Sequence, residues 1–255
     1  MLTSQRKILA QLSARHGQKK SPFFAVEGLR CAAEAWQRRP EWLEFAVATE
    51  DFLQSDDSAK FQGLPAVTTV SQAEFRQLTE TETPQGILLV MRKPEARTPQ
   101  ELPAPCTLIL DRLQEPGNVG TILRTAWALG MTSVWLTVGS ADPFAPKVVR
   151  AGMGAQFALD LWQVADLAAA KAHFLALGGQ ELWCAMPQSE TSLFSDDFRP
   201  GRTSALVIGN EANGISRPDL GRPVTIPMPG HAESLNAAQA ATVLLFEVLR
   251  KNLCE

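Results

Sequence analysis

The sequence has no apolar stretch long enough to span a bilayer, and residues 1–17 have neither a long apolar core nor a small-residue cleavage pattern. A spanning helix needs about 20 predominantly apolar residues, and a secretory signal needs both of the features missing at the N-terminus. The sequence therefore predicts a cytoplasmic protein with no membrane segment.

Cysteine and histidine are scarce, with four and three residues respectively. The cysteines lie far apart and form no CxxC pair, which disfavours a disulfide scaffold and a thiolate zinc site. No HExxH sequence or cluster of acidic ligands occurs, so we expect no metal. Walker A and GxSxG sequences are absent, and residues 151–157 lack the third glycine of a dinucleotide loop. A nicotinamide dehydrogenase is therefore a weak hypothesis.

The basic residues are unevenly distributed along a chain whose formal net charge is −3. Residues 1–39 contain eight Lys and Arg residues but two acidic ones. Such a patch can neutralise phosphates, and a solvated helix face explains it equally well. The residues predicted to contact RNA are Arg6, Lys7, Arg15, Lys19, Lys20 and Arg30.

Four prolines between residues 92 and 106 predict a linker, because proline interrupts both helices and sheet pairing. We assign the domains as 1–96, a linker at 97–105, and 106–255. In the first domain, helical patterns alternate with short strand-like runs, which predicts a small α/β unit. The helical patterns cover 4–15, 29–38 and 71–78, and the strands 23–26, 45–48, 66–69 and 87–91.

The second domain has longer apolar runs, separated in several places by helical patterns such as 119–129 and 166–177. Near-continuous apolar strands between helices predict a mostly parallel sheet covered on both faces. Ligands usually bind beyond the carboxyl ends of such strands. The predicted strands are 106–111, 133–138, 157–164, 181–186, 204–209 and 223–228.

Three loops of this domain depart from local rules. In the first, Asn118 is a good N-cap for a helix that begins near Val119, and Arg124 lies among small residues where an anionic group could reach it. Ordinary surface charge explains Arg124 as well. In the second, residues 206–216, the pair Asn213-Gly214 is typical of a hairpin turn. The two prolines that follow weaken that interpretation and favour a ligand loop.

The third loop precedes the last helix, which Ser234 or Asn236 can cap. The later apolar residues of this helix point in every direction, so we expect it to be buried nearly all round. Its first turns are almost all small, which suits a tightly wrapped chain end or a subunit interface. A well-packed terminal helix is the simpler alternative.

In this order, the three loops resemble the motifs of the SpoU (TrmH) family of RNA ribose 2′-O-methyltransferases in the SPOUT superfamily. Residues 148–157 resemble the family's segment between the first two motifs, and residues 23–35 are similar to a substrate-binding domain of members that act on large-subunit ribosomal RNA. The matching motif residues are Asn118, Gly120, Arg124, Gly209, Glu211, Gly214, Ser234, Leu235 and Asn236.

The resemblance implies an α/β fold: a C-terminal parallel-sheet domain with a deep trefoil knot, preceded by a small substrate-binding domain. It also implies a homodimer and S-adenosylmethionine held in the knot. The positions implied for cofactor binding are Gly209, Asn210, Ile226, Met228, Leu235 and Asn236.

By the same resemblance, Arg124 acts as a base or pairs with an RNA phosphate. A free arginine is a poor base, so the electrostatic role is favoured. Asn118, Glu211, Ser234 and Asn236 would orient Arg124, the ribose and the cofactor. The first motif reads QEPGN where an Asp-Pro pair is commoner, and the third reads SLNAAQA where SLNVS is usual.

The main hypothesis is therefore methyl transfer from S-adenosylmethionine to a ribose 2′-hydroxyl, with 23S ribosomal RNA as the favoured substrate. Transfer RNA is the alternative substrate. A non-catalytic RNA-binding or ribosome-assembly factor on the same fold is the alternative from another functional class.

Overall fold

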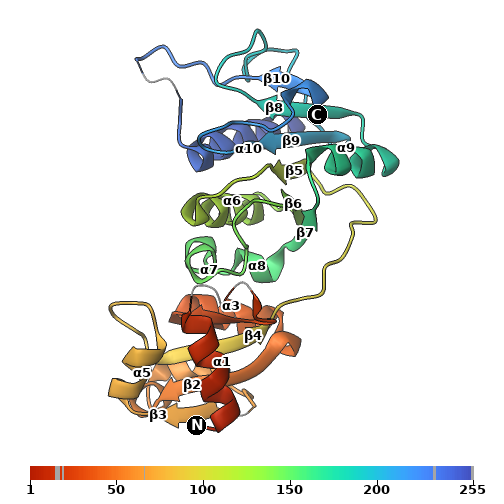
Figure 1. Ribbon diagram of the computed structural model, residues 1–255. Helices are drawn as coiled ribbons and strands as arrows, with labels where there is room; N and C mark the ends of the chain where they lie inside the picture. The colour runs from red at the N-terminus through yellow and green to blue at the C-terminus, as the bar shows by residue number, and fades with distance from the viewer. Residues whose placement is uncertain (15–17, 19, 66, 232–233, 254–255) are drawn as a thin grey trace. The chain divides into compact units, whose positions relative to one another are not determined.

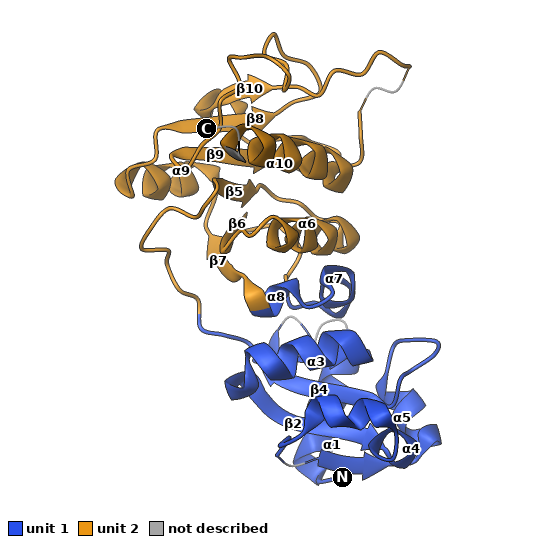
Figure 2. Ribbon diagram, turned by 180° about the vertical axis from the view of Figure 1, so that it is seen from behind, with its two compact units in different colours: residues 1–95, 144–157 blue, residues 96–143, 158–255 orange. Residues whose placement is uncertain are grey.

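The computed structural model describes residues 1–14, 18, 20–65, 67–231 and 234–253 (Figure 1). The chain divides into two compact units (Figure 2). The first unit contains residues 1–95 and 144–157, and the second contains residues 96–143 and 158–255. The predicted second domain was one continuous stretch, so the association of 144–157 with the first unit differs from that expectation.

The first unit has a four-stranded sheet in the order β1-β4-β2-β3. β4 pairs antiparallel with β1 and β2, and β3 runs parallel to β2. Along β4, Ile87, Leu89 and Met91 enter one apolar core while Leu88 and Val90 enter another, because successive strand residues point to opposite faces. The strands are β1 Phe23–Glu27, β2 Leu43–Thr49, β3 Val67–Val70 and β4 Ile87–Arg92.

Helices cover both faces of this sheet. α1 and α5 supply Leu9, Leu12 and Phe75 to the core of Leu88 and Val90, and α3 supplies Cys31 and other residues to the opposite core. Both cores consist of apolar side chains, and this layered arrangement matches the predicted α/β unit. The helices are α1 Thr3–Ser13, α3 Leu29–Arg38, α4 Glu50–Leu53 and α5 Gln72–Leu78, with 3-10 turns at Pro40–Trp42 and Asp56–Phe61.

The core around α3 is completed by a segment from much later in the chain. This segment forms α7 (Pro146–Gly152) and α8 (Ala155–Ala158). Val149 and Phe157 are buried in the same core as Phe24, whose ring centroid lies 6.2 Å from that of Phe157. The Cys31 thiol donates to the Val149 carbonyl at 3.7 Å. The first unit is therefore built from two separate pieces of sequence.

The second unit has a six-stranded sheet, parallel throughout its pairs, in the order β10-β8-β9-β5-β6-β7. Figures 1 and 2 show α9 on one side of this sheet and α6 and α10 on the other. The strand order reverses between the neighbours β5 and β9, which is where ligands bind in open parallel sheets. The elements are β5 Thr107–Leu110, α6 Pro116–Ala128, β6 Ser133–Thr137, β7 Asp160–Val164, α9 Leu167–Ala176, β8 Glu181–Ala185, β9 Ser204–Ile208, a 3-10 turn Pro218–Leu220, β10 Arg222–Val224 and α10 Ala237–Leu253.

Three details of the sequence prediction are wrong. The strand predicted for 157–164 begins at Asp160, because Phe157 belongs to a helix buried in the first unit. The strand predicted for 223–228 ends at Val224, and prolines at 227 and 229 oppose its continuation. α10 is not buried nearly all round in the single chain, since Val243 and Phe246 are 38% and 53% exposed.

Within the described residues, no helix combines the length and the apolar character that crossing a membrane requires.

Gly154 tests the packing of residues 144–157 on the first unit. Its φ is +99°, and a Cβ there would lie 2.7 Å from the Glu34 Cβ. Gly178 has a similar φ of +89° but nothing within 4 Å of such a Cβ. We expect Gly178→Ala to cost about 1–2 kcal/mol of unfolding free energy through backbone strain alone, and Gly154→Ala to add roughly 1–3 kcal/mol through overpacking. Denaturant titration measures both, and equal losses would contradict the close packing.

Candidate active site

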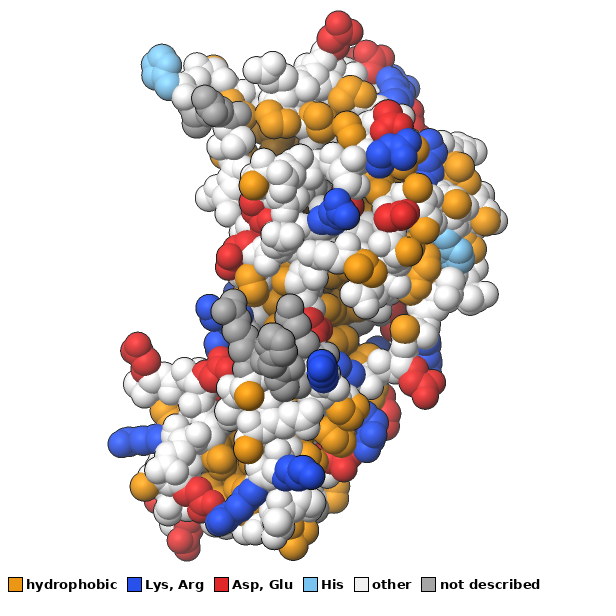
Figure 3. All heavy atoms as spheres, in the orientation of Figure 1, with side chains coloured by type: hydrophobic (Ala, Val, Ile, Leu, Met, Phe, Trp, Pro, Cys, Tyr) orange, Lys and Arg blue, Asp and Glu red, His pale blue; other side chains and the backbone are white. Residues whose placement is uncertain are grey.

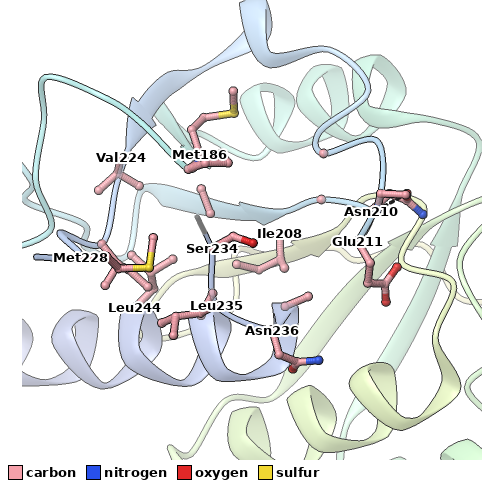
Figure 4. Close-up of a pocket in the computed structure, with 18 residues that line it drawn as sticks. Met186, Ile208, Asn210, Glu211, Val224, Met228, Ser234, Leu235, Asn236 and Leu244 are labelled. Carbon is pink, nitrogen blue, oxygen red and sulfur yellow. Dashed lines mark hydrogen bonds between the residues drawn. The ribbon is translucent and has the colours of Figure 1, made fainter. Parts of the chain in front are cut away.

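The loops after β8, β9 and β10 and the start of α10 surround a cavity of about 410 Å³. This volume falls within the roughly 300–1,000 Å³ typical of small-molecule sites. Figure 4 shows Met228, Val224 and Leu244 toward one end of it, and Asn210 and Glu211 at the other. An apolar surface with a few polar groups at one end suits a nucleoside-like ligand.

The loop after β9 is closed on itself by Asn210. The backbones of Asn210 and Gly214 exchange two hydrogen bonds of 2.9 Å, and the Asn210 Oδ1 accepts from the amides of Ala212 and Asn213. The next strand, β10, pairs in parallel with β8 and not with β9. After the loop, the Ser216 amide donates to the buried carboxylate of Asp111 at 2.6 Å. The segment is therefore a loop that lines the cavity and not the turn of a hairpin between paired strands.

Gly209 is required by the loop itself. A Cβ at this position would lie 2.5 Å from the Gly214 carbonyl carbon and 2.5 Å from the Ile215 nitrogen. The family resemblance implies that Gly209 is a cofactor-binding position. The structure assigns the space to the protein's own returning backbone, although Gly209 also lines the cavity.

The Glu211 carboxylate connects the first and second motif loops. It accepts hydrogen bonds from the backbone amides of Gln114 and Glu115 at 3.2 and 3.1 Å, and from the Asn118 side chain at 2.9 Å. Partial burial alone would raise the pKa of Glu211, but the hydrogen bond from Asn118 and the bonds from the backbone amides outweigh it and lower the pKa. The group therefore stays ionised at neutral pH.

Asn118 joins this cluster to the third motif. Its Oδ1 accepts from the Asn236 side chain at 2.9 Å, and the Asn236 Oδ1 in turn accepts from the Ala238 amide at the start of α10. The prediction that Asn118 is the N-cap of its helix is wrong. α6 begins at Pro116 with Glu115 as its cap, which leaves the Asn118 amide to bridge the loops.

Ser234, Leu235 and Asn236 all line the cavity, but Arg124 does not. Arg124 lies on the exposed side of α6, six residues and about one and two-thirds turns beyond Asn118. Its guanidinium makes no hydrogen bond or ion pair with the residues that the structure describes. Three of the predicted orienting residues, Glu211, Ser234 and Asn236, thus line the cavity, and Asn118 is hydrogen-bonded to two of them. The predicted catalytic arginine lies outside the cavity lining.

The predicted cofactor residues share one location. Each of them lines the cavity, so the geometry is compatible with the assignment, which stays a prediction. These residues are Gly209, Asn210, Ile226, Met228, Leu235 and Asn236.

Four of the basic residues predicted to contact RNA lie on the surface of the first unit: Arg6, Lys7, Lys20 and Arg30. On the face seen in Figure 3, Lys and Arg side chains lie among Asp and Glu side chains. Arg6 is paired with Glu74 at 3.3 Å. Lys7, Lys20 and Arg30 are exposed, while Arg15 and Lys19 lie outside the described residues. Their contact with RNA stays a prediction.

Two known families match the chain. Residues 105–246 match the SpoU rRNA Methylase family, and residues 4–89 match the MRM3-like substrate binding domain. The chain belongs to the SpoU rRNA methylase family. The first match spans the cavity and all three motif loops, and the second spans most of the first unit.

Relatives and solved structures agree with this family. An uncharacterized tRNA/rRNA methyltransferase of Synechocystis sp. is 35% identical over 71% of this chain and 66% of its own length. The 23S rRNA (guanosine(2553)-2′-O)-methyltransferase RlmP of Bacillus subtilis is 32% identical over 93% of both chains. The crystal structure of the SpoU methyltransferase AviRb from Streptomyces viridochromogenes, in complex with AdoMet, is 26% identical and aligns over 99% of both chains with a TM-score of 0.85.

These matches confirm the predicted fold class and the predicted S-adenosylmethionine-dependent RNA 2′-O-methyltransferase. The trefoil knot is a separate statement about chain threading and stays a prediction. Among the described residues, no group of three or more His, Cys, Asp and Glu side chains could hold a metal ion.

The sequence prediction missed part of the SpoU cavity. Met186 and Pro187, which follow β8, line it, as do Val224 and Leu244. The position of Met186 and Pro187 directly after an apolar run could have suggested them, because all carboxyl ends of a parallel sheet meet at one edge. Leu244 had no such signal, since an apolar residue inside a helix reads as ordinary core.

The Glu211 cluster of this SpoU protein can be tested with Glu211→Gln. The amide presents an NH₂ group to donors that need an acceptor, so at least one hydrogen bond is lost. We expect the Kd for S-adenosylmethionine to rise about tenfold, the equivalent of about 1.4 kcal/mol. Isothermal calorimetry measures it, with the exposed Glu190 changed to Gln as the matched control. An unchanged Kd would contradict a role of Glu211 in holding the cavity.

A comparison of wild type with Glu211→Gln also tests the pKa of Glu211. A carboxyl with a lowered pKa in the folded state stabilises the fold above its ordinary pKa, and this stabilisation is lost as the pH falls through the lowered value. We expect wild type to unfold at higher urea than Glu211→Gln near neutral pH, and the difference to shrink in acid. A difference that stays constant with pH would contradict the shift.

Proposed function

We propose that the chain methylates a ribose 2′-hydroxyl of large-subunit ribosomal RNA, at the nucleotide equivalent to guanosine 2553, the position named for the Bacillus subtilis relative. The supporting observation in the structure is the hydrogen-bonded chain Glu211–Asn118–Asn236, which joins all three motif loops at one cavity. The match of residues 4–89 to a substrate-binding domain supports an RNA substrate. A cytoplasmic location stays a prediction.

The cavity suits S-adenosylmethionine in size and lining. Ile226, Met228 and Leu235 would contact the adenosyl group, and backbone groups of the loops after β9 and β10 would bind its polar edge. When bound, the cofactor supplies an electrophilic methyl group. The protein's own task is to hold the ribose in line with it and to ease the loss of the hydroxyl proton.

We propose that Arg124 provides the positive charge that eases the loss of the proton from the ribose 2′-hydroxyl. A guanidinium remains charged at neutral pH, so it favours the deprotonated hydroxyl, or the neighbouring phosphate, by electrostatic attraction rather than by accepting a proton. Asn118 and Asn236 have fixed orientations through Glu211 and the start of α10, so they can position the ribose and the cofactor loop.

We further propose a homodimer through α10. Phe194, Val243 and Phe246 are exposed by 68%, 38% and 53%, and with Leu193 they surround one hollow on the surface. Such a cluster is typical of a protein interface. α6 contacts α10 through Thr125 and Thr242 at 3.2 Å, so a partner bound over α10 would also approach the exposed side of α6 that carries Arg124.

Arg124→Ala tests the catalytic assignment. We expect methyl transfer from labelled S-adenosylmethionine to ribosomal RNA to fall at least 100-fold, because loss of one electrostatic stabiliser typically costs 10²–10³ in rate. The calorimetric Kd for S-adenosylmethionine should stay within about twofold, since Arg124 does not line the cavity. Arg202→Ala, at an exposed arginine outside the cavity, is the control. Full activity of Arg124→Ala would overturn its role.

Phe246→Asp tests the dimer. Burying a new carboxylate in an apolar interface is strongly unfavourable, so we expect the variant to sediment as a monomer while wild type sediments as a dimer. Leu175→Asp provides the control, because Leu175 is 45% exposed on α9, away from α10. A monomeric wild type would contradict the proposal.

The RNA target is tested by mapping ribose methylation in cells with and without the protein. Loss of methylation at the nucleotide equivalent to guanosine 2553 is the expected result. Loss in transfer RNA instead would support the alternative substrate. A wild-type protein that binds RNA but shows no calorimetric binding of S-adenosylmethionine would support the non-catalytic alternative.

A further inference from the structure

A second cavity, of about 350 Å³, lies against the same loop as the cofactor cavity. Asn210 and Gly214 line both cavities and form the wall between them. None of its other lining residues belongs to the predicted site. These are Arg112, Gln114, Val138, Gly139, Asn213 and Ser216.

The sheet topology explains why these residues meet. Arg112 follows the carboxyl end of β5, Val138 that of β6, and Asn213 lies in the loop after β9. The three strands are parallel, and β5 pairs with both of the others, so the three ends lie at the same edge. The second cavity therefore lies at the same edge of the sheet as the cofactor cavity. An RNA substrate that approaches the cofactor would pass close to it.

Arg112 has an unusual backbone conformation. Its φ is +54°, in the left-handed region that costs a side-chain-bearing residue free energy. The Arg112 amide donates to the Thr137 hydroxyl at 2.9 Å, and its carbonyl accepts from the Asn210 side chain at 2.9 Å. Such conformations persist where surrounding contacts impose them, and they concentrate at functional sites.

The chemistry of this cavity suits one nucleotide. The Arg112 stem lies over Gly139, where a Cβ would be 3.4 Å from the Arg112 Cγ, and no described residue forms a hydrogen bond or ion pair with its guanidinium. Val138 is 56% exposed and offers an apolar surface. Gln114, Asn213 and Ser216 supply polar groups, and none of the described residues that line the cavity is acidic.

We propose that this second cavity binds a nucleotide of the RNA substrate that neighbours the methylated one, with its phosphate on Arg112 and its nucleoside against Val138. A guanidinium pairs with phosphate by two parallel hydrogen bonds, and an apolar side chain beside it can contact the ribose or base. This inference rests on the proposed function, because it assigns a subsite to the same RNA substrate. It gives Arg112 a role in RNA binding that is separate from the role of Arg124.

Arg112→Gly tests the subsite without straining the fold, because glycine adopts positive φ at no steric cost. The probe is a ribosomal RNA fragment spanning the equivalent of guanosine 2553. We expect its Kd, measured by fluorescence anisotropy, and its KM to rise roughly tenfold, with kcat and the Kd for S-adenosylmethionine within about twofold. The slope of log K against log salt should become shallower by roughly 0.7, the value for one phosphate of a single strand.

Arg202→Gly is the matched control. Arg202 is exposed and precedes the amino end of β9, so it lies at the opposite edge of the sheet. The Arg202→Gly substitution removes the same charge as Arg112→Gly does. We expect the RNA affinity and the salt slope of this variant to equal those of wild type. Val138→Asp adds an anion beside Arg112 at an exposed position and should weaken RNA binding as Arg112→Gly does.

Each other outcome has a defined meaning. Equal RNA affinity and salt slope for Arg112→Gly and wild type would overturn the subsite, as would a loss of S-adenosylmethionine affinity, which would make Arg112 a support of the cofactor loop. If wild type binds the RNA with the expected Arg112 dependence but does not methylate it, the proposed function fails and the subsite stands. A wild type that binds neither ribosomal nor transfer RNA overturns both.

Discussion

The carboxylate of Glu211 is the group on which the arrangement of the three motif loops depends. It accepts from two backbone amides before α6 and from Asn118 within it, and Asn118 is in turn bound by Asn236 at the start of α10. Backbone amides at a helix start have no partner within the helix, so an anion there is stabilising. One side chain thereby fixes the starts of two helices relative to the loop after β9.

The same hydrogen bonds make an acidic residue compatible with the proposed RNA-binding surface. Three N–H groups share the negative charge of Glu211, which reduces its repulsion of phosphate. Arg112 and Arg124 lie on either side of Asn118 in the sequence. Within the described residues, neither guanidinium forms an ion pair with an acidic side chain. The positive charges of the surface are therefore available to a ligand, while the negative charge is used internally.

The sequence predicted most of the regular elements well, and its errors at Asn118 and at residues 157–159 occur where a distant contact decides the local structure. α3 was expected at 29–38 and spans Leu29–Arg38, because its apolar periodicity is strong. Propensity predicts an N-cap at Asn118, but the Asn118 side-chain amide donates a hydrogen bond to Glu211, 93 residues away in the sequence. Apolar periodicity predicts that Val149 is buried, but it does not predict which residues Val149 packs against. The sequence pattern therefore could not assign Val149 to one of the two units. The motif residues were predicted from family resemblance; the left-handed backbone of Arg112 had no signal in the sequence.

Asn210 links the two cavities in one hydrogen-bond arrangement. Its Nδ2 holds the Arg112 carbonyl, its Oδ1 holds the amides of Ala212 and Asn213, and its backbone closes the loop with Gly214. A ligand in either cavity would contact this same loop, which its own hydrogen bonds already hold in one conformation. Neither ligand would therefore have to order the loop, which favours the binding of both. The orientation of a single amide side chain thus helps to set the shape of both cavities.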